Sequence, residues 1–145
     1  MWKLDVAERL SAWRDFRRVL DKQDLQTALE STARFWQSSP FSPYYLDPSS
    51  TSKWPDPWTL ISENYYCDIA KALGMLYTIA LTQHSPELEL RIYYDTHARV
   101  NYNLVWVDDG KYVLNMTDSE VVNRRQLPDT FELKFKYNSK ELIEK

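Results

Sequence analysis

The sequence of 145 residues is poor in the groups that most enzymes use for chemistry. It contains one cysteine, two histidines and two glycines. A single cysteine excludes an internal disulfide, and together with two histidines it is too few for the usual four-ligand zinc site. The two glycines stand far apart, so the chain has no glycine-rich phosphate loop. We therefore expect no cofactor and no metal site, and any catalysis would depend on very few side chains.

An excess of charge of one sign and long apolar runs are also missing. The chain has 18 Lys and Arg against 21 Asp and Glu, a formal net charge of −3, whereas domains dedicated to nucleic acid are usually basic. No run reaches the roughly 18 apolar residues of a membrane span, and the charged N-terminus lacks the apolar core of a signal peptide. These absences predict a cytoplasmic protein that binds neither nucleic acid nor membrane.

Aromatic residues are abundant by contrast. Phe, Trp and Tyr make up 14% of the chain, with six Trp and ten Tyr. The length fits a single domain that buries a core. We divide that domain, residues 1–145, into a helical hairpin at 1–37, a loop rich in proline, serine and aromatic rings at 38–58, and a core at 59–145.

The N-terminal part has the apolar spacing of two helices. Large apolar residues recur at helical intervals over residues 2–20, and Asp24 is placed to cap a second helix over residues 25–37. The break between them is short, which predicts an antiparallel pair. The next segment, residues 38–58, holds five of the seven prolines, which exclude a regular helix or a central strand.

Residues 67–81 are apolar almost throughout and predict the central, buried helix of the fold. Ser62 or Asn64 could cap its start, which would place Cys67 in or near the first turn. Gly74 lies inside this helix at a cost of about 1 kcal/mol in helix propensity. We expect another element to approach the helix closely at that glycine.

The remainder of the chain alternates apolar and polar residues and predicts strands. They fall at residues 88–94, 99–107, 111–115 and 131–137, with a short helix at 118–126 and a frayed end at 140–145. Helices followed by hairpin-connected strands are typical of an α+β domain. We therefore predict an N-terminal helical hairpin, a central buried helix and an antiparallel sheet of about four strands.

Cys67 has two interpretations. Buried cysteines commonly pack as small inert hydrophobic residues. A cysteine at the start of a helix can instead be a nucleophile, because the helix N-terminal amides stabilise its thiolate. Its position alone favours the inert interpretation.

The order of a cysteine heading a buried helix, a strand and then a hairpin resembles the transglutaminase-like core, a papain-related thiol fold. Residues 67–74, CDIAKALG, are similar to the family's cysteine-containing helix motif. Residues 103–115, NLVWVDDGKYVLN, are similar to its histidine- and aspartate-bearing hairpin. The resemblance covers about 50 residues, from Cys67 onward, and leaves the first 58 residues unmatched.

The resemblance implies a degenerate site. It places the family's catalytic histidine at Asn103 and its catalytic aspartate at Asn115, with Cys67 kept as the nucleophile. Asparagine cannot accept a proton from a thiol near neutral pH. His97 could serve as the base only with a different alignment, since six residues of strand separate it from Asn103, roughly 20 Å. His84 follows the far end of the helix.

The hairpin offers an internal test of this alignment. A three-residue loop at 108–110 would pair Asn103 with Asn115 on one face of the sheet. A two-residue loop at 109–110 would place them on opposite faces. The resemblance therefore predicts the longer loop.

We expect a non-catalytic protein-interaction or structural module on a degenerate transglutaminase-like fold. Its overall look is similar to that of structural or accessory proteins of tailed phages, which would place it in a virion or in the host cytoplasm. The alternative is a thiol hydrolase or acyltransferase that uses Cys67, with His97 as base. The partner is a protein of unknown identity, and the aromatic residues expected to bind it are Trp2, Trp13, Tyr44, Tyr45, Trp54 and Trp58.

Overall fold

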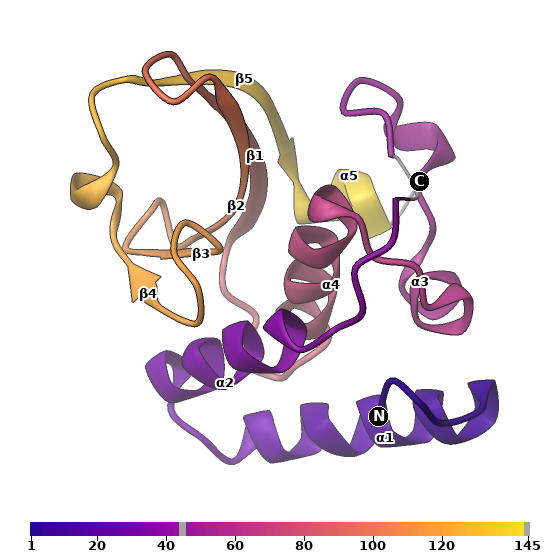
Figure 1. The fold of residues 1–145 in the computed structure, drawn as a ribbon. Helices are drawn as coiled ribbons and strands as arrows, with labels where there is room; N and C mark the ends of the chain where they lie inside the picture. The colour runs from indigo at the N-terminus through magenta and orange to yellow at the C-terminus, as the bar shows by residue number, and fades with distance from the viewer. Residues whose placement is uncertain (44–45, 144–145) are drawn as a thin grey trace.

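A computed structural model describes residues 1–43 and 46–143. The two N-terminal helices, α1 (Val6–Asp21) and α2 (Leu25–Gln37), lie beneath the rest of the molecule (Figure 1). The cap predicted for the second helix is confirmed, because the Asp24 carboxylate accepts a hydrogen bond from the Thr27 amide at 2.8 Å. None of the helices in the described ranges has the length and apolarity to cross a membrane.

The proline-rich segment is an ordered covering rather than a free linker. It contains a short 3-10 helix, η1 (Thr51–Lys53), and then the unpredicted helix α3 (Pro57–Glu63). Helix α3 is compatible with its proline, which occupies a first-turn position where no amide donor is needed, after the Asp56 cap. Trp54 is buried and contacts the Tyr137 ring at 5.6 Å, which attaches the segment to the sheet.

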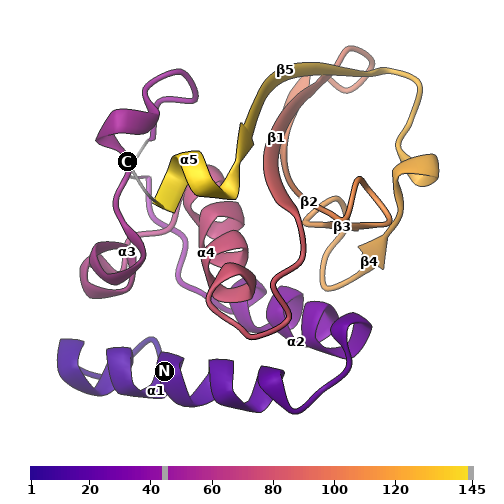
Figure 2. The ribbon, with the colours of Figure 1, turned by 180° about the vertical axis from the view of Figure 1, so that it is seen from behind.

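The central helix is α4 (Asp68–Ala80), with the sheet on one side and α3 and α5 (Ser139–Ile143) on the other (Figures 1 and 2). The predicted caps were wrong: Cys67 itself occupies the N-cap position, and Asn64 ends α3 in a left-handed conformation, φ 58°. The close approach at Gly74 is confirmed, because a Cβ there would lie 2.5 Å from the Trp36 ring of α2.

The sheet is antiparallel with strand order β4-β3-β2-β1-β5, one strand more than expected. Two local predictions were wrong. Residues 118–126 form the short strand β4 and a 3-10 helix, η2 (Arg124–Gln126), and residues 139–143 form α5, whose Leu142 is fully buried. The strands are β1 (Leu88–Asp95), β2 (Val100–Val107), β3 (Tyr112–Leu114), β4 (Val121–Val122) and β5 (Phe131–Asn138).

The two faces of the sheet have separate cores. The inner face contributes residues such as Ile92 and Val105 to the large core around α4. The outer face carries a smaller cluster that includes Tyr93 and Trp106 and is covered by the chain after β3. This alternation fixes which strand residues face the start of α4.

Three helices meet at one buried hydroxyl. Thr78 Oγ1 of α4 accepts hydrogen bonds from the indole nitrogens of Trp13 in α1, at 3.0 Å, and of Trp36 in α2, at 2.8 Å. The same hydroxyl donates to the Gly74 carbonyl at 2.7 Å. The hairpin is thereby joined to the helix that carries Cys67.

Candidate functional site

Cys67 and Asn103 line one cleft of about 410 Å³. Its walls come from residues 41–43 and Pro48 of the proline-rich segment, from the first residues of α4, and from β1 and β2. Its lining residues come from the start of α4 and from the parts of β1 and β2 near the turn that joins them.

Cys67 lies in the cleft because of how α4 starts. Its backbone is extended, φ −77° and ψ 178°, and the residue is 8% exposed. Its side chain makes no capping hydrogen bond, so it does not satisfy the amides of the first turn. The next residue, Asp68, also lines the cleft. The sequence analysis did not include Asp68 in the site. Its position directly after Cys67 in the sequence is the feature that could have indicated its place in the cleft.

Asn103 reaches the cleft through strand parity. It alternates with Val105 and Val107, which pack in the core around α4, and it pairs with Ile92 of β1. Asn103 is only 7% exposed, and its Oδ1 has no hydrogen-bond partner among the residues that the structure describes. An uncharged side chain thus stands in the cleft at the position where the resemblance puts a histidine.

The hairpin between β2 and β3 has the tight turn, so the predicted three-residue loop was wrong. Val107 pairs with Tyr112, and the Lys111 amide donates to the Asp108 carbonyl at 3.2 Å. Continuing this register sets Leu104, not Asn103, opposite Asn115. The hairpin test therefore fails: this register does not support the assignment of the family's catalytic histidine and aspartate to Asn103 and Asn115.

Asn115 nevertheless lies near Asn103 by a different route. It follows the last residue of β3 with a left-handed backbone, φ 73°, and its Nδ2 donates to the Asn103 carbonyl at 2.9 Å. It lines a small cavity of about 170 Å³ together with Asp68 and Lys71 of α4. Its carboxamide therefore supports the backbone of β2 on the helical side of the sheet, and it does not orient the Asn103 side chain.

The two histidines lie elsewhere. His97 is exposed in the β1–β2 turn, where its amide donates to Asp95 Oδ1 at 2.9 Å. Hydrogen bonds from the Thr130 side chain and from this amide lower the pKa of Asp95, which keeps the turn's acceptor ionised. His84 Nε2 is 2.8 Å from the Leu20 carbonyl at the end of α1. Neither imidazole lines the Cys67 cleft.

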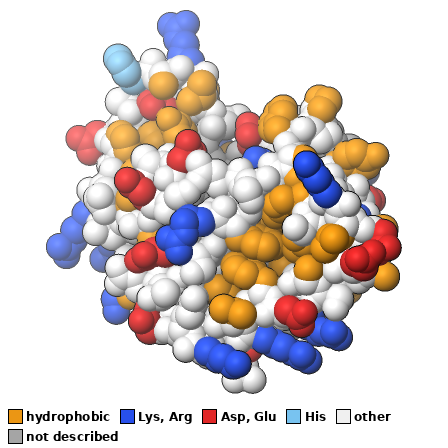
Figure 3. Space-filling model, turned by 60° about the horizontal axis from the view of Figure 1, so that its bottom comes forward, with side chains coloured by type: hydrophobic (Ala, Val, Ile, Leu, Met, Phe, Trp, Pro, Cys, Tyr) orange, Lys and Arg blue, Asp and Glu red, His pale blue; other side chains and the backbone are white. Residues whose placement is uncertain are grey.

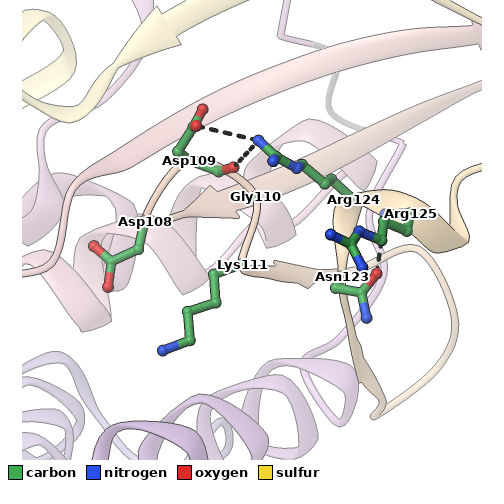
Figure 4. A pocket seen from close by; sticks show the side chains of 7 residues that line it. All are labelled: Asp108, Asp109, Gly110, Lys111, Asn123, Arg124 and Arg125. Carbon is green, nitrogen blue, oxygen red and sulfur yellow. Dashed lines mark hydrogen bonds and ion pairs between the residues drawn. The ribbon is translucent and has the colours of Figure 1, made fainter.

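A second cavity, of about 350 Å³, lies at the β2–β3 turn (Figure 4). Arg124 crosses it and donates to the Asp109 carbonyl and carboxylate at 3.2 and 3.1 Å. Gly110 has φ 79°, and a Cβ there would lie 2.5 Å from the Trp106 ring. These contacts describe a turn that is braced by the Arg124–Asp109 ion pair.

Two of the rings expected to bind a partner are in the core instead. Trp13 and Trp54 are buried, and each indole nitrogen has an internal acceptor: Thr78 Oγ1 for Trp13, and the Asp47 carbonyl for Trp54. The prediction of an exposed role for them was wrong. In the sequence, Arg14 and Asp15 follow Trp13, and Lys53 and Pro55 flank Trp54.

The remaining rings differ in exposure. Trp2 is half-buried against Trp36 and Tyr66, whereas Trp58 is 49% exposed and lies edge-on to a buried indole. Tyr44 and Tyr45 lie outside the described residues. The face that Figure 3 brings forward shows apolar side chains gathered near its centre, with basic side chains along its lower edge.

No protein-family model matches the sequence, and no curated protein matches it either. Solved structures do match. Calcium-bound LapG from Legionella pneumophila superposes with a TM-score of 0.74 at 16% identity, covering 95% of this chain and 78% of that one. The EGTA-treated form gives 0.73 at 16% identity, covering 94% and 76%. The fold is transglutaminase-like.

A third LapG structure agrees, with a TM-score of 0.70 at 15% identity over 95% of this chain and 82% of that one. At this level of identity the likeness establishes the fold and leaves the chemistry to the residues of the cleft.

Proposed function

We propose that this protein is a non-catalytic protein-interaction module that keeps a transglutaminase-like cleft without an imidazole to act as general base. The observation that carries the proposal is the composition of the cleft: Cys67 is accompanied by Asn103, and both imidazoles lie outside it. A thiol hydrolase needs a base within hydrogen-bond reach of its nucleophile. A carboxamide cannot take that proton.

The alternative is a thiol hydrolase or acyltransferase with His97 as base. That residue lies in the exposed turn that precedes β2, and Asn103 lies three residues, about 10 Å, into that strand. The amide of His97 is also bonded to Asp95, which holds the turn in place. This geometry favours the non-catalytic function.

The reactivity of the thiol tests the proposal. Alkylation of Cys67 by iodoacetamide is followed by mass spectrometry from pH 6 to pH 9, in the native and in the urea-unfolded protein. We expect the native thiol to react at least about tenfold more slowly at every pH, because it is buried and no imidazole lines its cleft. Incubation with a p-nitrophenyl ester should leave no acylated protein.

A native thiol that reacts faster than the unfolded one at pH 6, or an acyl adduct that disappears in Cys67→Ser, would refute the non-catalytic function. In Cys67→Ser the fold should remain intact, because the change removes little volume. The circular dichroism spectrum of that variant is therefore the control for both assays.

Metal binding and cellular location are not addressed by this test. One LapG structure is calcium-bound, but the part of this chain that the structure describes has no group of three or more His, Cys, Asp or Glu side chains able to hold a metal ion. The proposal therefore includes no metal. A place in a phage virion or in host cytoplasm rests on the overall look of the sequence and stays a prediction.

A further inference from the structure

The Cys67 cleft carries negative charge. Among the described residues that line it, Asp68 is the only charged one. Its side chain is exposed, and within the described ranges it makes no hydrogen bond or ion pair; the nearby Lys71 instead donates to the Ser39 carbonyl at 3.1 Å. A free carboxylate in a concave site attracts a cation.

The cleft also contains an unsatisfied acceptor. Asn103 is more than nine-tenths buried, and within residues 1–43 and 46–143 its Oδ1 has no hydrogen-bond partner. A buried polar atom without a partner is costly, so a donor that reaches it is favoured. The terminal torsion of asparagine is soft, which allows the oxygen to turn toward the cleft.

The walls of the cleft are apolar and open. Phe41 is 67% exposed and Val100 is 46% exposed, and both line the cleft. Ile92 forms part of its base and is fully buried. Aliphatic groups of a ligand would cover these side chains and remove them from water.

The start of α4 supplies the complementary donors. The first-turn amides receive no hydrogen bond from the Cys67 side chain, and the helix dipole places partial positive charge there. That end of the helix suits a peptide carbonyl oxygen. Because Asp68 occupies the first helical position, a fully charged anion would meet repulsion at the same place.

We infer that the cleft binds an extended peptide segment through a lysine or arginine side chain. The aliphatic stem of that side chain lies against Phe41 and Val100, its charged head meets Asp68, and peptide N–H and C=O groups meet Asn103 and the first turn of α4. This inference rests on the proposed function, because a cleft that cleaved its peptide would not retain it.

The test uses fluorescein-labelled octapeptides with one central lysine between two leucines. The matched peptide has norleucine in place of lysine, and a third has glutamate. Binding to the full chain is measured by fluorescence anisotropy at low salt. We expect the lysine peptide to bind about fivefold more tightly than the norleucine peptide, the effect of one exposed ion pair, and the glutamate peptide to bind most weakly.

Variants locate the site. Asp68→Asn should remove the preference for lysine, whereas Asp129→Asn, which deletes an exposed carboxylate outside the cleft, should leave it unchanged. Val100→Glu should weaken the norleucine peptide as well, because it removes apolar contact. Amide chemical shifts of 15N-labelled protein should change around Asn103 and the start of α4.

Equal affinities for the three peptides, a preference that survives Asp68→Asn, or shifts confined to other surfaces would overturn the inference. These outcomes leave the proposed function intact if the peptides stay uncleaved. Cleavage or acyl transfer from the lysine peptide, dependent on Cys67, would instead overturn the proposed function.

Discussion

Replacing Thr78 by valine should destabilise the protein far more than its small change in shape suggests. Valine keeps the branched shape and removes only the hydroxyl. Thr78 is fully buried, and its Oγ1 is the acceptor for the indole N–H groups of Trp13 and Trp36. Both rings are fully buried as well, so neither donor can turn to water.

The magnitude follows from counting the donors left without partners. A buried donor without an acceptor costs about 1–3 kcal/mol, so two should lower the free energy of unfolding by about 3 kcal/mol or more. Thr78→Ser keeps the hydroxyl and loses one methyl group, worth about 1 kcal/mol. With an unfolding entropy of about 2.1 cal/mol/K per residue, the valine variant should melt about 10 °C below wild type.

Urea unfolding followed by tryptophan fluorescence, at constant m-value, measures both variants. The free energy of unfolding of the valine variant should be lower than that of the serine variant by about 2 kcal/mol. If the two variants agree within about 0.5 kcal/mol, Thr78 is not the acceptor that joins the three helices, and the placement of both indoles is wrong.

Three further predictions concern the cleft, the central helix and alkaline pH. Asn103→His supplies a base in the cleft and should raise the alkylation rate of the thiol at pH 7 by about tenfold; an unchanged rate would show that position 103 does not face it. Gly74→Ala should lower the unfolding free energy by about 1–2 kcal/mol in urea titrations, because the clash with Trp36 outweighs the gain in helix propensity; a more stable variant contradicts the close packing. Burial raises the pKa of Tyr66 and of Tyr77, so unfolding free energy should hold up to about pH 10 and then fall, as the unfolded chain loses phenolic protons that the folded chain keeps. In urea titrations, Tyr66→Phe should leave the free energy of unfolding unchanged or raise it, because it removes a hydroxyl that has no partner among the described residues. Tyr77→Phe should lower the free energy of unfolding by about 1 kcal/mol, because it removes a hydrogen bond. The reverse order would contradict the hydrogen bonding assigned to both hydroxyls.

Patterns of apolar residues predicted the regular parts of the fold. The central helix is a nearly continuous apolar run, β1 and β5 alternate apolar and polar residues, and α2 has a capping aspartate. Helix α3 and the C-terminal α5 escaped prediction because each is short and gains its stability from packing: Leu60 and Leu142 are buried against the rest of the core. In the sequence, α3 is also hidden among prolines.

The site was predictable where it depends on order along the chain. Cys67 before a buried helix and Asn103 at a strand position of known parity meet in one cleft. The position of Asn115 was not predictable. The register of the tight turn alone would place it opposite Leu104, but its own left-handed backbone after β3 lets its side chain reach the Asn103 carbonyl. Asparagine adopts that conformation more readily than most residues, but the sequence does not say at which asparagine it occurs.

The long reach of Arg9 affects how the protein folds during synthesis. From α1, its guanidinium donates to the carbonyls of Ile61 and Ser62 at 2.8 and 3.0 Å, across more than 50 residues. The first two helices therefore lack these partners, and the Thr78 hydroxyl, until much of the chain has left the ribosome. A nascent hairpin with unburied indoles is a natural target for chaperones, and the molecule should fold only after α4 emerges.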